Sequence, residues 1–273
     1  MSHLLDGLAE NWLINIVAFI RDYLVYAIAV WLILWVILRA PLAARKIRRD
    51  SPPAGQLVRE LALSIRSMAT FATINLLIVV MDRAGLYPLP KLGATWGPVW
   101  FWASLALMIV AHDAYFYWTH RLMHDPRLFR RFHRTHHKSN NPSPFTAYSF
   151  DLHEAGLTMG FFILWYAVTP TPWAVGMLFT VHQIARNTLL HSGYELMPAR
   201  PNGKPLLDFL TTTTHHDLHH GQAGWNYAAW FTWWDRWMGT EHPDYQARYA
   251  AAAWRIRLPG RHDGRLGRAR NSG

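Results

Sequence analysis

The sequence predicts an all-α fold: a multi-pass membrane helical bundle with a histidine-rich helical cap on its cytoplasmic side. Composition provides the first two observations. Hydrophobic residues make up 51% of the 273 residues and charged residues only 16%, whereas soluble domains carry about 25% charged residues on average. The chain also has 15 tryptophans, 16 histidines and no cysteine. The lack of cysteine excludes disulfides, cysteine-ligated zinc and iron–sulfur clusters from this chain.

The first apolar segment is predicted to span the bilayer over about residues 22–40. A spanning helix needs about 20 mostly apolar residues, and residues 23–40 nearly supply them. Arg21 and Asp22 are expected to mark the outer boundary, with residues 3–20 at the membrane interface. The N-terminus has neither a basic region nor a small-residue cleavage site, so we expect no cleaved signal peptide.

A basic loop after this span orients the predicted bundle. The positive-inside rule places the loop in the cytoplasm, and its cations are Arg45, Lys46, Arg48 and Arg49. A second span is expected at about residues 61–81, followed by a proline-rich outer loop and a third helix from near Pro98. We predict that residues 1–95 form one unit of N-terminal spans and basic loop.

The third helix is apolar in its first half and polar in its second half, which carries Asp113, His120 and His124. It should therefore leave the bilayer on the side of the basic loop. Further cations support that side, namely Arg121, Arg127, Arg130, Arg131, Arg134 and Lys138. The histidines are thus predicted to lie at the cytoplasmic face of an integral membrane protein, in the inner membrane if the source is bacterial.

Two apolar arms, residues 156–169 and 173–191, are joined by two prolines and are each too short for a comfortable span. We expect them to form a re-entrant or paired-helix unit that returns to the cytoplasmic side. Asn187 lies four residues before His191 and shares its helical face. His182 lies nine residues before His191, on the opposite face of one continuous helix.

The C-terminal part is rich in tryptophan and then in arginine. An aromatic belt at the membrane interface is expected from Trp225, Trp230, Trp233, Trp234 and Trp237. The arginine-rich segment from Arg255 is expected to be mobile or to lie on anionic lipid. We predict a central functional domain at residues 96–245 and a basic tail at residues 246–273, with no internal repeat.

Three histidine clusters repeat spacings that bring side chains together on a helix, because residues three or four positions apart share a face. The clusters are His120 and His124; His133, His136 and His137; and His216, His219 and His220. Neutral imidazole is the commonest side-chain metal ligand, and these rings exceed what one four- to six-coordinate ion can use. The pattern therefore predicts a di-metal site in the cap, against the alternative of unrelated core or surface histidines.

Other chemistries fit this pattern less well. The zinc-protease signature HExxH begins at His153-Glu154, but Leu157 stands where its second histidine belongs. A haem needs only one or two axial ligands. The net charge of +10 lies beside apolar segments, which favours anionic lipid over nucleic acid as its partner. Two metals held by nitrogen suit oxygen chemistry on lipid C–H bonds, since imidazoles survive oxidants better than thiolates. The side chains of Asp113 and Asn187 are predicted to orient the ligand rings by contacting the N–H groups of those rings.

The motifs HRLMH, HRTHH, HSGY and HHDLHH, followed by NY and WDRWMGT, resemble the fatty acid hydroxylase superfamily over about residues 99–240. This membrane group includes sterol desaturases, methylsterol oxidases and sphingolipid hydroxylases. The resemblance implies two iron ions, with zinc possible in purified material, and dioxygen as co-substrate. It implies the metal ligands His120, His124, His133, His136, His137, His191, His216, His219 and His220. Asp113 matches an acidic residue common before the first motif, and His112, His182 and His215 lie outside the motifs.

The predicted protein is a membrane-bound di-iron oxygenase that hydroxylates or desaturates an aliphatic lipid or sterol-like substrate. It would use dioxygen and two electrons from an external donor such as a ferredoxin or small cytochrome, since the chain shows no GxGxxG fingerprint. No catalytic residue beyond the metal ligands is predicted. The alternative is a non-catalytic membrane protein whose histidines bind structural or stored zinc. The sequence leaves open which lipid reacts, whether it is hydroxylated or desaturated, which donor serves and which oligomer forms.

Overall fold

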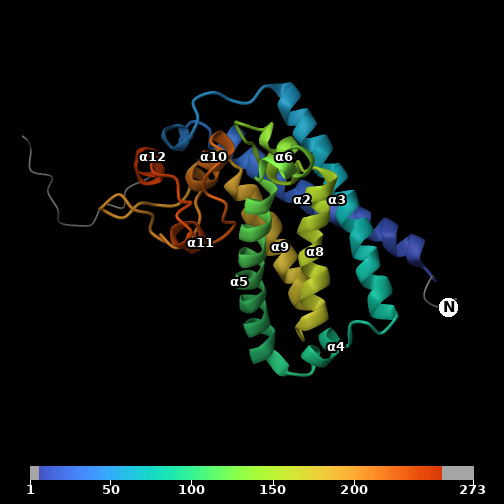
Figure 1. Cartoon of the computed structure of the whole chain (residues 1–273). Helices are drawn as coiled ribbons and strands as arrows, with labels where there is room; N and C mark the ends of the chain where they lie inside the picture. Colours follow the sequence, from blue (N-terminus) through green and yellow to red (C-terminus); the bar gives the residue numbers. More distant parts are fainter. Residues whose placement is uncertain (1–5, 254–273) are drawn as a thin grey trace, which may run out of the picture.

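The computed structural model describes residues 6–253, and the named secondary-structure elements of this part of the chain are all helices (Figure 1). Within residues 6–253 there are isolated β-bridges, such as that between Lys46 and Tyr194, but no strand. The all-α prediction is therefore confirmed. The predicted arginine-rich segment from Arg255 lies outside the described residues.

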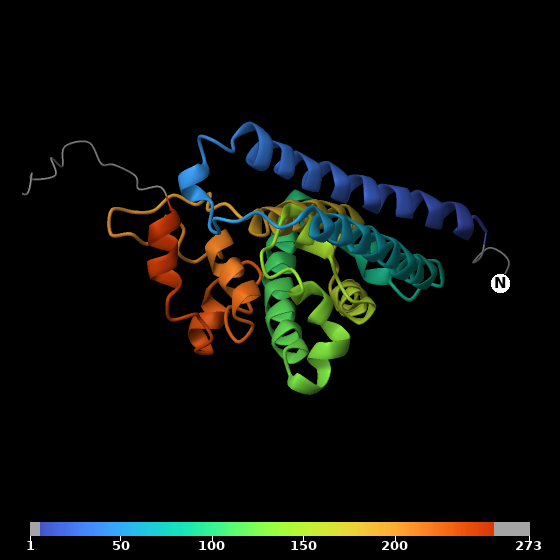
Figure 2. The same cartoon turned by 90° about the horizontal axis from the view of Figure 1, so that it is seen from above.

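Among the described residues, three helices are long and apolar enough to cross a membrane. They are α2 (Leu8–Trp31), which continues as the π-helical turn η1 (Leu32–Ile37), α3 (Ala54–Arg83) and α5 (Gly97–Met123). The third helix begins and ends where the sequence predicted. In Figure 2 the dark blue α2 runs obliquely along one side of the bundle, and in Figure 1 α5 and α3 lie on opposite sides of it.

The predicted start of the first span is wrong. Arg21 and Asp22 lie in the middle of α2 rather than at its outer boundary, and the helix already begins at Leu8. Arg21 Nη2 and Asp22 Oδ1 are 2.7 Å apart, so the two charges offset each other locally. A paired Arg and Asp therefore do not end an apolar helix that continues on both sides.

The two short apolar arms form the predicted helix pair, α8 (Leu152–Val168) and α9 (Trp173–Leu190). Figure 1 shows this pair beside α5, with its turn next to the short helix α4 (Pro88–Ala94) at the lower end. Gly93 permits this contact, because a Cβ at that position would lie 1.7 Å from the carbonyl oxygen of Pro170. The indole N–H of Trp100 donates to the same carbonyl at 2.6 Å.

A cap of short elements covers the opposite end of the bundle (Figure 1). Its elements are η2 (Ala43–Arg45), α6 (Pro126–Phe132), α7 (Arg134–His137), η3 (Pro144–Tyr148), α10 (Thr213–Gly221), α11 (Trp233–Trp237) and α12 (Tyr245–Ala252). Element η3 is tied into the membrane helices, since the Phe145 carbonyl accepts hydrogen bonds from Tyr23 at 3.1 Å and Ser64 at 2.9 Å. The cap is therefore fixed to α2 and α3.

The basic loop after α2 packs against this cap. Arg48 Nε donates to Asp217 Oδ1 of α10 at 2.8 Å, and the Ile47 amide donates to the Gly193 carbonyl at 3.0 Å. Figure 2 shows the light blue loop beside the orange and red C-terminal helices. The loop and the histidine cap thus share one end of the bundle, as predicted; that this end faces the cytoplasm stays a prediction.

The tryptophans do not form one interfacial belt. Trp230 is buried, with 4% of its surface exposed, while Trp237 is 66% exposed. Trp234 stacks on Tyr117 of α5, with ring centroids 5.6 Å apart. The belt prediction is wrong for Trp230, because that side chain fills the space between α5 and α9 beside His112 and His182.

Candidate metal centre

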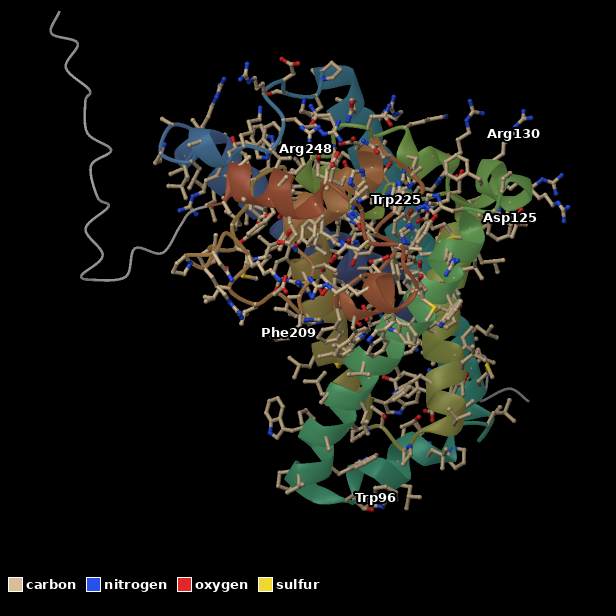
Figure 3. The ribbon with its side chains drawn as sticks, turned by 60° about the vertical axis from the view of Figure 1, so that its left-hand side comes forward. Trp96, Asp125, Arg130, Phe209, Trp225 and Arg248 are labelled. Carbon is tan, nitrogen blue, oxygen red and sulfur yellow. The ribbon has the colours of Figure 1, made fainter. Side chains whose placement is uncertain are left out.

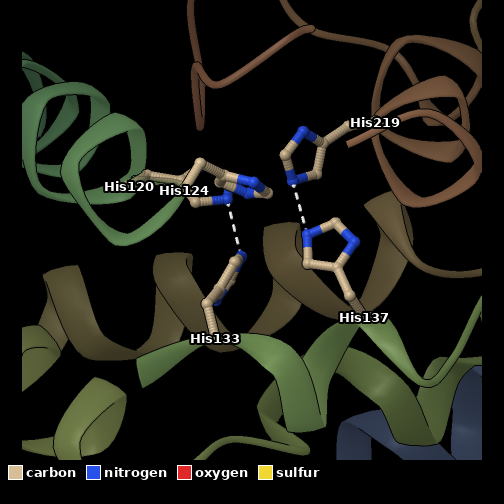
Figure 4. Close-up of side chains that lie close together, drawn as sticks. All are labelled: His120, His124, His133, His137 and His219. Carbon is tan, nitrogen blue, oxygen red and sulfur yellow. Dashed lines mark hydrogen bonds between the residues drawn. The ribbon is translucent and has the colours of Figure 1, made fainter. Parts of the chain in front are cut away.

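All nine predicted ligands gather at the capped end of the bundle in two groups, within which the potential ligand atoms lie within 4.8 Å of one another. The first group is His120, His124, His133, His137 and His219, and the second is His136, His191, His216 and His220. Figure 4 shows that the rings of the first group point toward one another. They come from the C-terminal end of α5, from α7 and the residue before it, and from α10. Their role as ligands stays a prediction.

The two groups do not follow the sequence motifs. His133 and His137 belong to the first group, whereas His136 between them belongs to the second. The predicted common face of these three residues is wrong, because α7 is only four residues long and begins after His133. In α10, His216 and His220 are one turn apart and share the second group, while His219 turns to the first.

The facing ring nitrogens have the spacing of atoms that share one metal ion. In the first group, His120 Nε2 lies 2.8 Å from His133 Nε2, and His137 Nε2 lies 3.0 Å from His219 Nε2. In the second group, His191 Nε2 lies 2.9, 3.2 and 3.4 Å from the Nε2 atoms of His216, His220 and His136. Ligand atoms on metal–nitrogen bonds of about 2.1 Å are separated by about 3.0–3.4 Å in tetrahedral or octahedral geometry.

Backbone carbonyls fix which nitrogen of three rings carries the proton. Nδ1 of His120 donates to the Tyr227 carbonyl and Nδ1 of His219 to the Trp225 carbonyl, both at 2.7 Å. Nδ1 of His191 donates to the Asn187 carbonyl at 2.8 Å. In a neutral ring the other nitrogen, Nε2, then carries a lone pair. Several lone pairs directed at one point repel each other unless a cation lies between them, so these residues fit a bound metal.

Burial keeps the rings neutral at physiological pH. His191 and His219 are 1% and 0% exposed, and burial lowers the pKa of each to about 4. Burial and the neighbouring rings also lower the pKa values of His136, His216 and His220 well below the ordinary range. A neutral imidazole is the form that binds metal. His124 is the most accessible member of its group.

The carboxyl group of Glu154 lies beside a predicted ligand ring, and this contact was not predicted from the sequence. Glu154 Oε1 lies 2.8 Å from Nδ1 of His133, and both side chains are buried. Buried carboxylates beside metal-ligating imidazoles commonly fix the ring and increase its basicity. The available signal was a lone acidic residue in the first turn of the apolar helix α8.

The predicted hydrogen bonds from Asp113 and Asn187 side chains to ligand rings are wrong. Asp113 Oδ1 instead accepts the amide protons of Trp230 at 2.7 Å and Phe231 at 3.3 Å. The Asn187 side chain donates to the Ala147 carbonyl at 2.6 Å, and it is the Asn187 backbone that holds His191. Helical spacing identified the correct neighbourhood, but it could not distinguish side-chain from backbone partners.

Asp113 and Asp235 anchor the segment that supplies two of the orienting carbonyls. Asp235 accepts the amide protons of Tyr227 at 2.8 Å and Ala228 at 3.0 Å. Together with Asp113 it fixes residues 227–231, next to Trp225. Burial raises the pKa of Asp235 to about 6, although the hydrogen bonds oppose that rise.

The three histidines outside the motifs also lie outside both groups. His112 Nε2 lies 3.2 Å from Gln183 Nε2. The ring centroid of His182 lies 5.4 Å from that of Trp230. His215 Nε2 lies 3.5 Å from Asp235 Oδ2. His112 and His215 are buried, and His182 is half-buried.

A cavity, here called the inner cavity, touches both histidine groups. Its lining includes five of the nine predicted ligands, namely His120, His133, His136, His191 and His216. The rest of its wall is mainly apolar and includes Phe116, Phe150, Leu190 and Trp230. A second cavity, here called the outer cavity, adjoins it between α2, α3, α8 and α9 and is lined by residues such as Phe19, Phe71 and Met159. The volume of the inner cavity is about 30 Å³ and that of the outer cavity about 50 Å³.

Comparisons with known proteins agree with the geometry. The sequence profile of the family described as "Fatty acid hydroxylase" matches residues 105–240. The chain is 33% identical over 158 residues to "Methylsterol monooxygenase 1" of Rattus norvegicus, covering 53% of this chain and 49% of that protein. It is 30% identical over 144 residues to a Delta(7)-sterol 5(6)-desaturase of Gibberella zeae, covering 52% and 43% respectively.

A third relative, a "Cholesterol 25-hydroxylase-like protein" of Danio rerio, is 32% identical over 173 residues, covering 58% of this chain and 66% of that protein. The chain spans about half the length of the first two relatives. No solved structure matches the chain significantly. The family match lies within the predicted functional domain at residues 96–245, whose boundaries stay a prediction.

Proposed function

We propose, on the premise that this chain belongs to the fatty acid hydroxylase superfamily, that it is a membrane-bound di-iron oxygenase acting on a lipid. One observation carries the proposal: an apolar cavity is lined by ring nitrogens from both histidine groups. A substrate carbon that entered this cavity would lie beside both metals. A structural metal site is instead closed on all sides by protein.

The two histidine groups would each hold one iron, the first with five imidazoles and the second with four. Bound iron would supply the activation of dioxygen. In hydroxylation, a C–H bond, dioxygen, two electrons and two protons give a C–OH group and one water. In desaturation, the same inputs remove two hydrogens from adjacent carbons and give an alkene and two waters. Placement of the substrate decides between these outcomes.

The chain's own residues position the ligands and exclude water. The carbonyls of Asn187, Trp225 and Tyr227 hold three rings in the metal-binding tautomer. Glu154 lies against Nδ1 of His133 and would stabilise positive charge on that ring when a metal binds. The aromatic side chains of Phe116, Phe150 and Trp230 line the cavity and keep water from the reacting carbon.

We also propose that an acidic redox protein, such as a ferredoxin or small cytochrome, delivers the electrons over α6. Six exposed cations surround this helix, namely Arg121, Arg127, Arg130, Arg131, Arg134 and Lys138. Figure 3 shows Arg130 and Asp125 at the outer edge of the capped end, opposite Trp96. Phe129 lies directly beneath this surface, with its ring 5.4 Å from that of His124 and 5.6 Å from that of His137. A negatively charged partner would therefore be attracted to this surface. There the ring of Phe129 would lie between the partner and the first histidine group.

The substrate is proposed to be a sterol-like or other aliphatic lipid. The names of the relatives refer to methylsterol, sterol and cholesterol, and the outer cavity lies among helices long enough to span a membrane. A lipid would thus reach the inner cavity from the bilayer. Comparative lipidomics of a deletion strain would identify the accumulated substrate and the missing product.

The first experiment is to measure the metal content of anaerobically purified protein, with Mössbauer spectroscopy on material grown with iron-57. About two irons per chain with coupled ferric spins would support the proposal. Persistent zinc, together with no oxygen-dependent lipid product after iron reconstitution, would instead favour a structural or storage metal site. His153→Ala serves as a control for histidine loss, since His153 lies outside both groups.

A further inference from the structure

A groove of about 570 Å³ lies where the first membrane helix ends, and we call it the basic groove. Its apolar edge includes Val36 and Ile37, which are 53% and 68% exposed and lie in the last turn of the continuous helix Leu8–Ile37. None of the nine predicted histidine ligands lines this groove. It is therefore separate from the candidate metal centre and lies at the end of a helix long enough to span a membrane.

The polar edge of the basic groove has an excess of positive charge. Its cations are Arg39, Lys46 and Arg49, and none of the described residues that line the groove is acidic. Arg39 and Arg49 are exposed, and neither forms an ion pair with another described residue. The neighbouring Arg48, by contrast, is paired with Asp217 at 2.8 Å. The groove thus presents cations whose charge the described residues do not neutralise.

Lys46 is held in the groove by neutral partners. Its Nζ lies 2.7 Å from Ser51 Oγ and 4.9 Å from the centroid of the Trp35 ring. Partial burial and then the nearby Arg39 lower the pKa of Lys46, while Asp50 opposes this shift. The positive charge of Arg39 therefore acts on Lys46 more strongly than the carboxylate of Asp50 does. An anion in the groove would reverse this unfavourable interaction.

One wall of the groove is built on the segment that follows the predicted ligand His191. Tyr194 lines the groove, and its ring packs edge-on against that of Trp35 with 5.8 Å between centroids. The indole N–H of Trp35 donates to the Ser192 carbonyl at 2.8 Å, and the backbone of Lys46 forms an antiparallel bridge with Tyr194. The basic loop is therefore fixed before a ligand binds, which lowers the entropy cost of binding.

The two edges of the groove together limit its ligand. Arginine and lysine bind phosphate oxygens through charge-assisted hydrogen bonds, and basic residues next to a span attract anionic lipid. The exposed side chains of Val36 and Ile37 need apolar contacts instead. A molecule with both a phosphate group and acyl chains satisfies both edges, whereas a soluble phosphate ester satisfies only the polar edge.

We propose that the basic groove binds one anionic phospholipid, whose phosphate lies among Arg39, Lys46 and Arg49 and whose acyl chains lie along Val36 and Ile37. This lipid is not the substrate of the proposed reaction, because the groove lies apart from both histidine groups. It attaches the basic loop, and hence the cap, to the membrane surface. The inference does not depend on the proposed function, and its test needs no turnover.

The test is native mass spectrometry of the full-length protein in detergent, titrated with phosphatidylglycerol or with phosphatidylcholine of the same acyl chains. The measurement is the Kd of the first bound lipid. We expect phosphatidylglycerol to bind about 25-fold more tightly, since each of two unpaired arginines contributes about fivefold. Glycerophosphoglycerol, the same headgroup without acyl chains, should bind far more weakly than phosphatidylglycerol.

The Arg39→Gln/Arg49→Gln variant should lose most of this preference by weakening the binding of phosphatidylglycerol, with little effect on phosphatidylcholine. Arg39→Lys/Arg49→Lys retains both charges and should retain most of the preference. The matched control is Arg127→Gln/Arg131→Gln, which removes two exposed cations from α6 at the same end of the bundle and should bind as the wild type does. Equal Tm values in detergent would show that the variants remain folded.

Three outcomes would overturn the proposal. Equal affinity of the wild type for the two phospholipids would show that the groove does not recognise anionic lipid. Glycerophosphoglycerol that binds as tightly as phosphatidylglycerol would indicate a site for a soluble phosphate ester. An equal loss of preference in the groove variant and in the α6 control would indicate a diffuse attraction of the whole cationic surface.

Discussion

Asp113 and Trp230 are 117 residues apart in sequence, yet Asp113 Oδ1 accepts the Trp230 amide proton at 2.7 Å in the buried space beside the metal centre. This contact fixes the segment whose Tyr227 carbonyl orients His120. Asp113 thus acts on the ligands through the backbone of a distant loop. The arrangement connects the middle of a membrane helix to the geometry of the first histidine group.

Asp113→Ala should therefore weaken metal retention in the first group without preventing membrane insertion. Loss of a buried hydrogen-bond acceptor leaves two backbone amides unpaired and costs about 2 kcal/mol, and the freed loop would no longer fix the ring of His120. The measurement is iron per chain by mass spectrometry after dialysis against a chelator. Retention equal to that of the wild type would show that the loop holds its place without Asp113.

Single ligand replacements should distinguish the two groups. His219→Ala removes a ring from the first group and His136→Ala removes one from the second. Each variant should lose activity and keep about half of the iron, because a buried site with a missing ligand binds metal far less tightly. Mössbauer spectra would then lose the coupling between the two ions. Full activity in either variant would remove that residue from the ligand set, with His153→Ala as the matched control.

Glu154→Gln tests the carboxylate that lies 2.8 Å from Nδ1 of His133. The amide has the same shape but no negative charge to stabilise the ring when it binds a cation. We expect a decrease of about 10- to 100-fold in metal affinity or in turnover. Thr158→Val, one turn further along α8, provides a comparison that keeps the carboxylate but alters the cavity wall. A Glu154→Gln enzyme as active as the wild type would assign Glu154 a packing role only.

Reversal of charge over α6 tests the donor surface. The double variant Arg130→Glu/Arg131→Glu should raise the KM for an acidic ferredoxin by about tenfold at low salt and have less effect at high salt, because exposed charges are screened. Single turnover after chemical reduction by dithionite should not change. Lys204→Glu, on an exposed loop after α9, is the control for a general change in net charge.

An unchanged KM for ferredoxin in the Arg130→Glu/Arg131→Glu variant would exclude this surface as the docking site. If the variant instead bound anionic vesicles less well while its reduction by ferredoxin stayed normal, these arginines would bind anionic lipid rather than the redox partner. The two readouts therefore separate a redox partner from the membrane surface.

Much of the fold and of the candidate site could be predicted from local sequence. Apolar length predicts three spans and the helix pair, since each depends on the partition of one segment into lipid. The start of α2 was not predicted correctly, since the helix begins at Leu8 and includes Arg21 and Asp22 as a local ion pair. Eight of the nine histidines were predicted from their spacing, which is a property of residues on one helix, and His191 was predicted from the resemblance to the family.

Local sequence was sufficient to predict which residues gather at the metal centre and at which end of the bundle. The division of these residues into two groups, and the contacts that hold them, depend on the tertiary structure. His136 and His137 are neighbours in sequence but belong to different groups, because α7 is a single turn whose adjacent side chains point in different directions. The carbonyls that orient the rings and the carboxylate of Glu154 come from separate segments. Contacts between distant segments depend on packing, and local periodicity carries no information about them.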